Sequence, residues 1–206
     1  MIQPFKDRNP FQIPPASHGL RIGLFGGSFN PPHPGHLHVS LTAIRQLQLD
    51  QLWWLVTPGN PLKQQNNLSS LNDRLLQCQR IARHPDIKVT AFEASYSFRY
   101  SADTISLLKQ RRPGAKFVWV MGADNLANFH KWDRWRDIVQ SVPLAIIDRP
   151  NSTATPNSTS ATHFLAKYRI DERDSSLLAD LDAPAWTFIH GRRSFLSSTK
   201  IRGANA

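Results

Sequence analysis

The sequence predicts an α/β fold, a parallel sheet with helices on both faces in a single domain. Short apolar runs that end in Gly or Pro alternate with stretches of helical periodicity, and this alternation is typical of a parallel sheet. The chain has 206 residues, of which 40% are hydrophobic, enough for the core of one sizeable domain. We therefore expect one domain over 19–206, preceded by a proline-bearing extension over 1–18 that is either poorly ordered or draped over the surface.

The predicted elements follow one another as strand and helix. Apolar runs at 20–25 and 51–57 predict the first two strands, and apolar residues at helical spacing predict a helix between them: Leu37, Leu41, Ile44 and Leu47. The same reasoning predicts strands at 87–92, 116–122, 142–148 and 186–190, and helices near 70–83, 102–111 and 161–169, with a short terminal helix opened by 197–199. The Ser- and Thr-rich stretch 149–162 is predicted to be a surface loop.

Charge and cysteine content narrow the partners and the compartment. Lys and Arg number 25 against 15 Asp and Glu, and the formal charge of +10 favours anionic partners such as nucleotides, nucleic acid or a lipid surface. The single cysteine, Cys78, excludes an internal disulfide and falls in an apolar helix pattern. No apolar run approaches the ~18 residues of a membrane span, and 1–18 lacks the apolar middle of a signal peptide. We expect a cytoplasmic protein without a membrane partner.

The stretch GGSFNPPHPGH, residues 26–36, is the strongest functional signal. It joins a strand to a helix, and a helix that begins there directs unpaired N–H groups and its positive dipole end at whatever lies above the sheet, with phosphate the natural occupant. Gly26 and Gly27 allow close approach of the main chain, and His33 and His36 are spaced to face one ligand. The stretch matches neither the G-x-G-x-x-G fingerprint nor a P-loop, so a different phosphate chemistry is indicated.

Three other interpretations of this stretch stay open. The first is a metal site formed by His33, His36 and His38, which is weakened because no carboxylate lies nearby in the sequence. The second is that the histidines only cap and pack, an interpretation that we favour for His38. The third is a proline-rich turn without a function.

At these residues the chain resembles a known family. Residues 26–36 resemble the GG(T/S)F(D/N)P-x-H-x-GH signature of the nucleotidyltransferase superfamily, and SSTKIR, residues 197–202, is similar to its second signature, S-S/T-T-x-I-R. GADNLANFHKWDRWRDI, residues 122–138, is similar to the G-x-D and W segment of bacterial nicotinate mononucleotide adenylyltransferases. The resemblance covers roughly 20–203. It implies a Rossmann-like fold and the transfer of AMP from ATP to nicotinate mononucleotide, giving nicotinate adenine dinucleotide and pyrophosphate.

The resemblance also implies roles for individual residues. His33 and His36 are the implied catalytic residues, both at the ATP phosphates, with His36 nearest the α-phosphate. The other implied ATP-binding residues are Gly26, Gly27, Ser28, Phe29, Asp124, Ser198, Thr199 and Arg202. The implied acceptor-binding residues are Lys63, Tyr100, Ser101, Trp132 and Arg149.

Several of these residues have a plainer interpretation that stays open. Asp124 could cap a helix, Lys63 could be a solvated loop lysine, and Arg149 could lie at the surface. Four other tryptophans fall in strand patterns and are expected in the core: Trp53, Trp54, Trp119 and Trp186. Because the sequence offers no cluster of carboxylates, Mg²⁺ is expected to enter with ATP and not at a protein site of its own.

Two further functions are weighed against this one. A sibling enzyme that adenylylates nicotinamide mononucleotide or phosphopantetheine would share both phosphate signatures, although residues 122–132 argue against phosphopantetheine. A basic nucleic-acid-binding module would explain the charge and the aromatic residues, but no recognised nucleic-acid motif is present. We therefore expect ATP and nicotinate mononucleotide as partners, and no nucleic acid.

Overall fold

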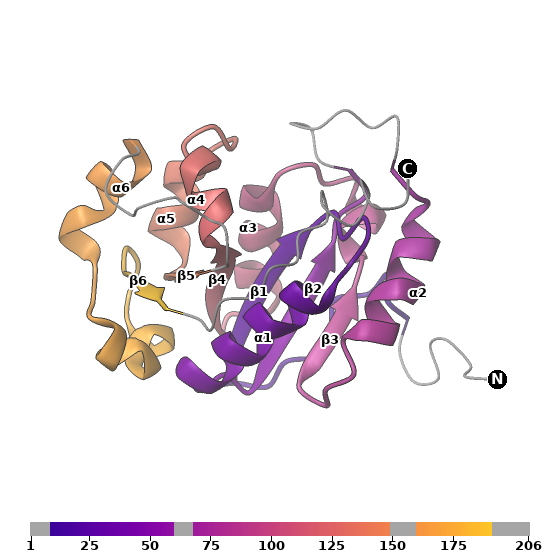
Figure 1. Ribbon diagram of the computed structural model, residues 1–206, viewed down its shortest axis with the longest axis horizontal. Helices are drawn as coiled ribbons and strands as arrows, with labels where there is room; N and C mark the ends of the chain where they lie inside the picture. The colour runs from indigo at the N-terminus through magenta and orange to yellow at the C-terminus, as the bar shows by residue number, and fades with distance from the viewer. Residues whose placement is uncertain (1–8, 60–67, 149–159, 191–206) are drawn as a thin grey trace.

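Six parallel strands form one sheet in the order β3-β2-β1-β4-β5-β6 (Figure 1). The computed structural model describes residues 9–59, 68–148 and 160–190. Its strands are β1 (Arg21–Gly27), β2 (Gln51–Val56), β3 (Ile87–Thr90), β4 (Lys116–Gly122), β5 (Leu144–Ile147) and β6 (Trp186–Ile189). Its α-helices are α1 (Pro34–Gln46), α2 (Leu71–Ile81), α3 (Ser101–Arg111), α4 (Ala123–Phe129), α5 (Trp135–Ser141) and α6 (Ser160–Leu165), and short 3-10 helices are η1 (Phe92–Tyr96), η2 (Ala166–Tyr168) and η3 (Glu172–Asp180).

The strand order reverses direction at β1. The chain runs outward from β1 through β2 to β3, returns through α3, and continues on the other side of β1 through β4, β5 and β6. Because all paired strands are parallel, their carboxyl ends meet at one edge of the sheet, where Gly27 pairs with Val56 and Gly122 with Ile147. In open α/β sheets, ligands bind outside these carboxyl ends, at the point where the order reverses. That point lies between β1 and β4.

Each face of the sheet is covered by its own apolar layer, and together these layers form a single domain. Val39 of α1, Leu75 of α2 and Leu178 of η3 pack against one face, whereas Ile105 of α3 and Ile138 of α5 pack against the other. The prediction for the four strand tryptophans is confirmed, since each is at most 2% exposed: Trp53, Trp54, Trp119 and Trp186. The α/β fold with helices on both faces is likewise confirmed.

The structure departs from the predicted elements in the second half of the chain. It contains α4, α5 and η3, which the sequence pattern did not predict, and Trp135 is buried at the start of α5 although it follows a polar turn. Helices of seven residues make two turns, too few for a clear apolar period. Two predicted strands are shorter, because β3 ends at Thr90, before η1 begins at Phe92, and β5 occupies only 144–147.

The described part of the N-terminal extension lies along the sheet. Pro10 accepts hydrogen bonds at its carbonyl oxygen from the Ala91 amide and from Thr90 Oγ1, both at 2.8 Å. Phe11 packs against one apolar layer and Ile13 against the other. Residues 9–18 are therefore draped over the sheet, one of the two alternatives expected from the sequence.

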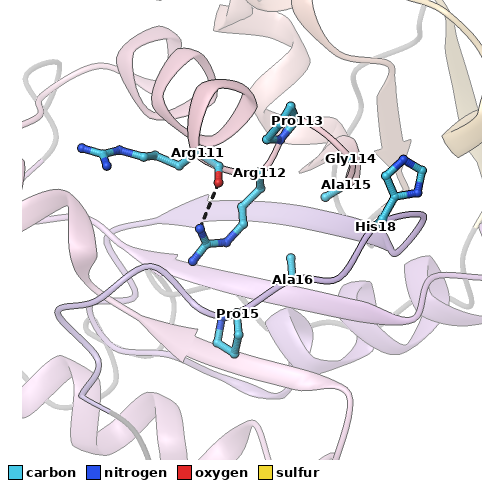
Figure 2. Close-up of a pocket in the computed structure, with 8 residues that line it drawn as sticks. All are labelled: Pro15, Ala16, His18, Arg111, Arg112, Pro113, Gly114 and Ala115. Carbon is cyan, nitrogen blue, oxygen red and sulfur yellow. Dashed lines mark hydrogen bonds between the residues drawn. The ribbon is translucent and has the colours of Figure 1, made fainter.

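A pocket lies where this segment meets the turn after α3 (Figure 2). Figure 2 shows its lining residues: Pro15, Ala16, His18, Arg111, Arg112, Pro113, Gly114 and Ala115. His18 precedes β1 and Gly114 precedes β4, so the pocket lies at the amino ends of these two strands. It is therefore separate from the edge where residues 26–36 leave the sheet.

Candidate active site

The loop that follows β1 begins at the reversal point of the sheet. Gly26 and Gly27 are the last residues of β1, and the chain reaches the first turn of α1 at Pro34. On the neighbouring strand, Gly122 ends β4 and Asp124 lies in the first turn of α4. The predicted phosphate-binding loop and the predicted ribose-binding carboxylate therefore belong to adjacent strand ends.

His33 and His36 form a reciprocal cap at the start of α1. His33 is the N-cap residue, and its Nδ1 accepts a hydrogen bond from the Gly35 amide at 3.1 Å. The His33 amide in turn donates to Nδ1 of His36 at 3.1 Å. Both side chains are buried, 1% and 8% exposed, and their ring centroids lie 3.8 Å apart. Capping therefore accounts for one nitrogen of each ring.

This cap fixes the tautomer of both neutral rings. Since Nδ1 of His33 and of His36 accepts a backbone N–H, the ring proton must be on Nε2, an assignment that follows from the hydrogen-bond network. An Nε2–H group donates to anionic oxygens and has no lone pair for a metal ion. The two rings are thus better suited to bind phosphate oxygens than to coordinate a metal ion.

Aromatic rings surround His36 and set its orientation. Phe29 lies 4.9 Å from His36 between ring centroids and stacks on Trp54 at 4.8 Å, with only 10° between the two planes. Trp54 Nε1 donates to Ser40 Oγ at 2.7 Å, and Ser40 Oγ donates to the His36 carbonyl at 2.8 Å. Trp54 and Ser40, which the sequence did not single out for the site, therefore support the histidine from β2 and from the next turn of α1.

Packing also accounts for the two glycines. A Cβ at Gly26 would lie 3.0 Å from the ring of Trp119, and a Cβ at Gly27 would lie 3.2 Å from the ring of Phe29. Close approach of aromatic rings thus favours glycine there, in addition to any approach by a ligand. Phe29 is itself buried, 2% exposed.

Asp124 does not cap its helix. The N-cap residue of α4 is Gly122, and Asp124 is exposed in the first turn. The N-cap interpretation of Asp124 is therefore wrong, and its carboxylate lies at the edge of the sheet where the expected ribose contact would be made.

Three of the five predicted acceptor residues lie on two neighbouring segments. Tyr100 is the N-cap residue of α3 and Ser101 its first residue, and the cap has no side-chain hydrogen bond. Trp132 is half-buried and packs edge to face on Trp119 at 6.1 Å and on Phe129 at 5.4 Å. The first N–H groups of a helix have no partner within it, so the head of α3 can donate to an anion.

An ion pair connects these two segments. Arg134, two residues after Trp132, binds Asp103 in the first turn of α3. Arg134 is a surface residue, so the ion pair contributes little to stability. The pair nevertheless connects the turn that carries Trp132 to the start of α3.

A buried carboxyl group lies just behind the head of α3. Glu93 is 6% exposed and accepts a hydrogen bond from Thr104 Oγ1 at 2.6 Å. Burial raises the pKa of Glu93, and the hydrogen bond from Thr104 only partly opposes this. The connection between β3 and α3 is thus tied to α3 from inside the fold.

The thiol and the possible metal-ligating groups of the described residues can be examined directly. The thiol of Cys78 is fully buried, and burial raises its pKa, so the thiolate is disfavoured. Within 9–59, 68–148 and 160–190, no group of three His, Cys, Asp or Glu side chains could hold a metal ion. In the same ranges, no helix is both long and apolar enough to cross a membrane.

Five predicted site residues lie outside the described residues: Lys63, Arg149, Ser198, Thr199 and Arg202. The predicted terminal helix that begins with 197–199 and most of the predicted loop 149–162 lie outside them as well.

The family to which the chain belongs follows from a comparison with known proteins. The family model described as cytidylyltransferase-like matches residues 24–204, from the middle of β1 onward. The chain therefore belongs to the cytidylyltransferase-like family and is a nucleotidyltransferase.

Individual relatives of the chain narrow the assignment within this family. The chain is 57% identical over 190 residues to a probable nicotinate-nucleotide adenylyltransferase of Mesorhizobium japonicum, covering 92% of this chain and 97% of the relative. It is 56% identical over 183 residues to a protein of the same name from Brucella suis, covering 89% and 94%. Within the wider family, the chain belongs with the nicotinate-nucleotide adenylyltransferases.

Solved structures agree with the fold. Two structures of the Plasmodium falciparum nicotinic acid mononucleotide adenylyltransferase, one complexed with APC and one with NaAD, each match with a TM-score of 0.65 over 89% of this chain and 83% of theirs. The sequence identities are 19% and 21%, so this likeness shows the fold alone.

Proposed function

We propose that the chain transfers AMP from ATP to nicotinate mononucleotide, giving nicotinate adenine dinucleotide and pyrophosphate. The observation that carries this proposal is the pair of buried histidines at the head of α1, whose Nδ1 atoms are both used by the cap. The Nε2–H donors that this tautomer creates and the N-terminus of α1 favour a phosphate chain at the reversal point of the sheet. Relatives at 56–57% identity supply the acceptor class.

The reaction needs no nucleophile from the protein. An oxygen of the acceptor phosphate attacks the α-phosphorus of ATP, the bond from that phosphorus to the bridging oxygen breaks, and pyrophosphate leaves with the electron pair. Catalysis consists of aligning the two phosphates and stabilising the charge that develops on the α-phosphate and the leaving group. His36 Nε2–H donates to the α-phosphate oxygens, and His33 Nε2–H positions the phosphate chain.

Other residues hold the remainder of each substrate. Asp124 accepts hydrogen bonds from the ATP ribose, and the backbone of 26–29 approaches the nucleotide. The second signature supplies Ser198, Thr199 and Arg202 for the β- and γ-phosphates. On the acceptor side, backbone N–H groups near Tyr100 and Ser101 bind the nicotinate carboxylate, and Trp132 stacks on the pyridine ring. Lys63 and Arg149, which lie outside the described residues, are assigned to the acceptor as well.

Mg²⁺ enters as the complex with ATP. It is a hard cation that prefers oxygen ligands and keeps several waters, and it neutralises charge on the phosphates. The Nε2–H tautomer of His33 and His36 supports this route, since neither ring offers that nitrogen as a ligand. We also propose a cytoplasmic protein without a nucleic-acid partner.

The test measures pyrophosphate release with ATP and either nicotinate or nicotinamide mononucleotide. N–H donors that bind a carboxylate leave one donor opposite the NH₂ of the amide, a mismatch of roughly 1–3 kcal/mol to which the lost charge adds. We expect kcat/KM to favour the acid by at least ~100-fold. Equal use of both acceptors by the wild type would leave only the broader assignment as a nucleotidyltransferase.

A pair of variants tests the acceptor site itself. Trp132→Ala should lower kcat/KM for both acceptors, because stacking involves the ring and not its substituent. Lys131→Ala, which changes an exposed residue of the same turn, should leave both values unchanged. If Trp132→Ala behaves like the wild type, Trp132 does not belong to the site.

A further inference from the structure

Arg74 is a charged residue on the inner face of α2. It shares that face with Leu75 and with Cys78 one turn later, and it is only 1% exposed. Ser70 begins the helix, since its Oγ accepts the Asp73 amide at 3.1 Å. The first turn of α2 therefore places the Arg74 side chain inside the fold, on a helix face whose other buried residues, Leu75 and Cys78, are apolar.

The guanidinium group binds four backbone carbonyls from three segments. Nη1 donates to the Ser28 and Thr57 carbonyls, each at 2.7 Å, which lie just beyond the ends of β1 and β2. Nη2 donates to the Pro58 carbonyl at 3.2 Å, and Nε donates to the Ser69 carbonyl at 3.0 Å. One planar side chain thus joins the loop after β1 to both ends of the connection between β2 and α2.

The loop after β1 needs such an external support. Phe29, next to Ser28, has a φ of 47°, in the left-handed region that is unfavourable for a bulky side chain. A second tie reaches the same loop, because Asn30 Oδ1 accepts the Ser69 amide at 3.2 Å. Ser69 and Arg74 together therefore hold 28–30, three residues before His33.

The four carbonyls that bind Arg74 are neutral, so they do not neutralise its positive charge. In the part of the chain that the structure describes, Arg74 forms no ion pair with a carboxylate. Burial lowers the pKa of Arg74, but the ordinary value for arginine is so high that the group stays protonated. A positive charge behind the loop favours an anion in front of it.

We propose that Arg74 is a positioning residue for adenylyl transfer: by holding the carbonyls at the ends of β1 and β2, it fixes the loop that presents His33 and His36 to the phosphates of ATP. The proposal rests on the proposed function. It assigns no contact between Arg74 and substrate. The fork of the guanidinium matters because a lysine keeps the charge but offers one nitrogen, which cannot reach carbonyls on three segments at once.

The experiment compares Arg74→Lys and Arg74→Met with the wild type in single turnovers at saturating ATP and nicotinate mononucleotide. A small displacement of reacting groups costs about 100-fold in rate, so we expect both variants to be slower by roughly 10- to 100-fold. In Arg74→Lys, which keeps the charge, the KM for ATP should stay within about threefold of the wild type. Arg74→Met should also raise the KM for ATP, because it removes the charge.

Two control variants separate positioning from stability. Leu75→Ala removes a buried neighbour on the same helix and should lower the melting temperature while keeping the single-turnover rate of the folded enzyme. Arg80→Met removes an exposed arginine from α2 and should change neither. All rates are measured at a temperature at which circular dichroism shows the variants to be folded. If Arg74→Met does not fold, the comparison uses Arg74→Lys and Arg74→Gln.

Two results would overturn the proposal. One is a wild-type rate in Arg74→Lys, which would reduce the role of Arg74 to its charge. The other is a loss in the Arg74 variants no larger than that in Leu75→Ala at the same folded fraction, which would make the role purely structural. A wild type that forms no product with either acceptor contradicts the proposed function instead.

Discussion

At the scale of single residues, the two histidines of the loop after β1 combine a structural and a chemical task in one ring. Nδ1 of each ring holds the start of α1, and the tautomer that results leaves a proton on Nε2. The helix cap therefore organises the donors before any ligand arrives. Such preorganised donors stabilise a transition state without reorganising at the moment of reaction.

His36 allows these two tasks to be separated. His36→Ala removes both nitrogens, whereas the side-chain oxygen of Asn in His36→Asn can replace Nδ1 as acceptor of the His33 amide. Both variants should lower kcat by ~100-fold or more with little change in ATP binding, as expected for an interaction made only in the transition state. Only His36→Ala should also lose the roughly 0.5–2 kcal/mol of a helix cap, measured by urea unfolding.

The neighbouring His33 is expected to behave differently. His33→Ala should change both kcat and KM, because the phosphate chain must be positioned before the reaction. His38→Ala is the matched control on the same helix and should leave the kinetics unchanged. A loss confined to KM in His36→Ala would contradict the role given to His36.

Glu93 makes stability depend on pH. Burial raises its pKa above the ordinary value of 4.5, so the folded protein holds this proton more tightly than the unfolded chain does. Its contribution to stability is then fully present below the unfolded pKa and is lost as the pH rises through the folded pKa. Glu93→Gln resembles the protonated form and can still accept from Thr104.

The expected result is a difference that grows with pH. Near pH 5, about where an ordinary glutamate ionises, Glu93→Gln and the wild type should unfold at similar urea concentrations, and near pH 8 the variant should be the more stable. Asp174→Asn, which removes an exposed carboxylate of η3, is the control for the loss of a surface charge. A constant difference between Glu93→Gln and the wild type would show that folding does not raise the pKa of Glu93.

At the scale of elements, the sequence predicts best where a period repeats. The strands of the first half and the helices α1, α2 and α3 follow apolar spacing closely, and the histidine loop carries its own signature. The short helices α4 and α5 are not predicted, because two turns are too few to show an apolar period. Trp135 is buried through tertiary packing, which the local sequence does not reveal.

Buried polar groups at the site were missed for a related reason. Arg74 was not singled out because a single arginine in a helical pattern usually faces solvent, although its place on one face with Leu75 and Cys78 was a usable signal. The contacts of Trp54 with Ser40 and Phe29 join elements that are separate in the sequence, so no spacing could have predicted them.

The N-terminal segment gives a prediction at this scale. Phe11 and Ile13 are partly buried against opposite apolar layers, so Phe11→Ala and Ile13→Ala should each lower the free energy of unfolding by about 1–2 kcal/mol. Gln12→Ala lies between them at an exposed position and should stay within about 0.5 kcal/mol of the wild type. Urea unfolding measures all three, and no loss at 11 and 13 would mean that this segment does not unfold with the sheet.

At the scale of the whole molecule, the topology concentrates the chemistry. All six strands of the described ranges are parallel, so the loops that follow β1 and β4 emerge at one edge, and the order reverses there. Residues more than ninety positions apart, such as Gly26 and Trp119, meet because β1 and β4 are neighbours in the sheet. The pocket of Figure 2 lies at the opposite edge, at the strands' amino ends.

Salt dependence tests whether the net charge of +10 serves the binding of nucleic acid or only that of nucleotides. A nucleic-acid-binding protein that makes 6–10 phosphate contacts loses roughly 10³- to 10⁵-fold in affinity between 50 and 200 mM salt, because each neutralised phosphate releases counterions. A nucleotide in a built site relies on a few short contacts that salt screens far less. We therefore expect kcat/KM for ATP to fall by only about two- to fivefold over that range. The measurement pairs this titration with binding of a single-stranded oligonucleotide at low salt; tight binding of the oligonucleotide together with a steep loss of turnover would favour the nucleic-acid interpretation, because both would then depend on the same diffuse positive field.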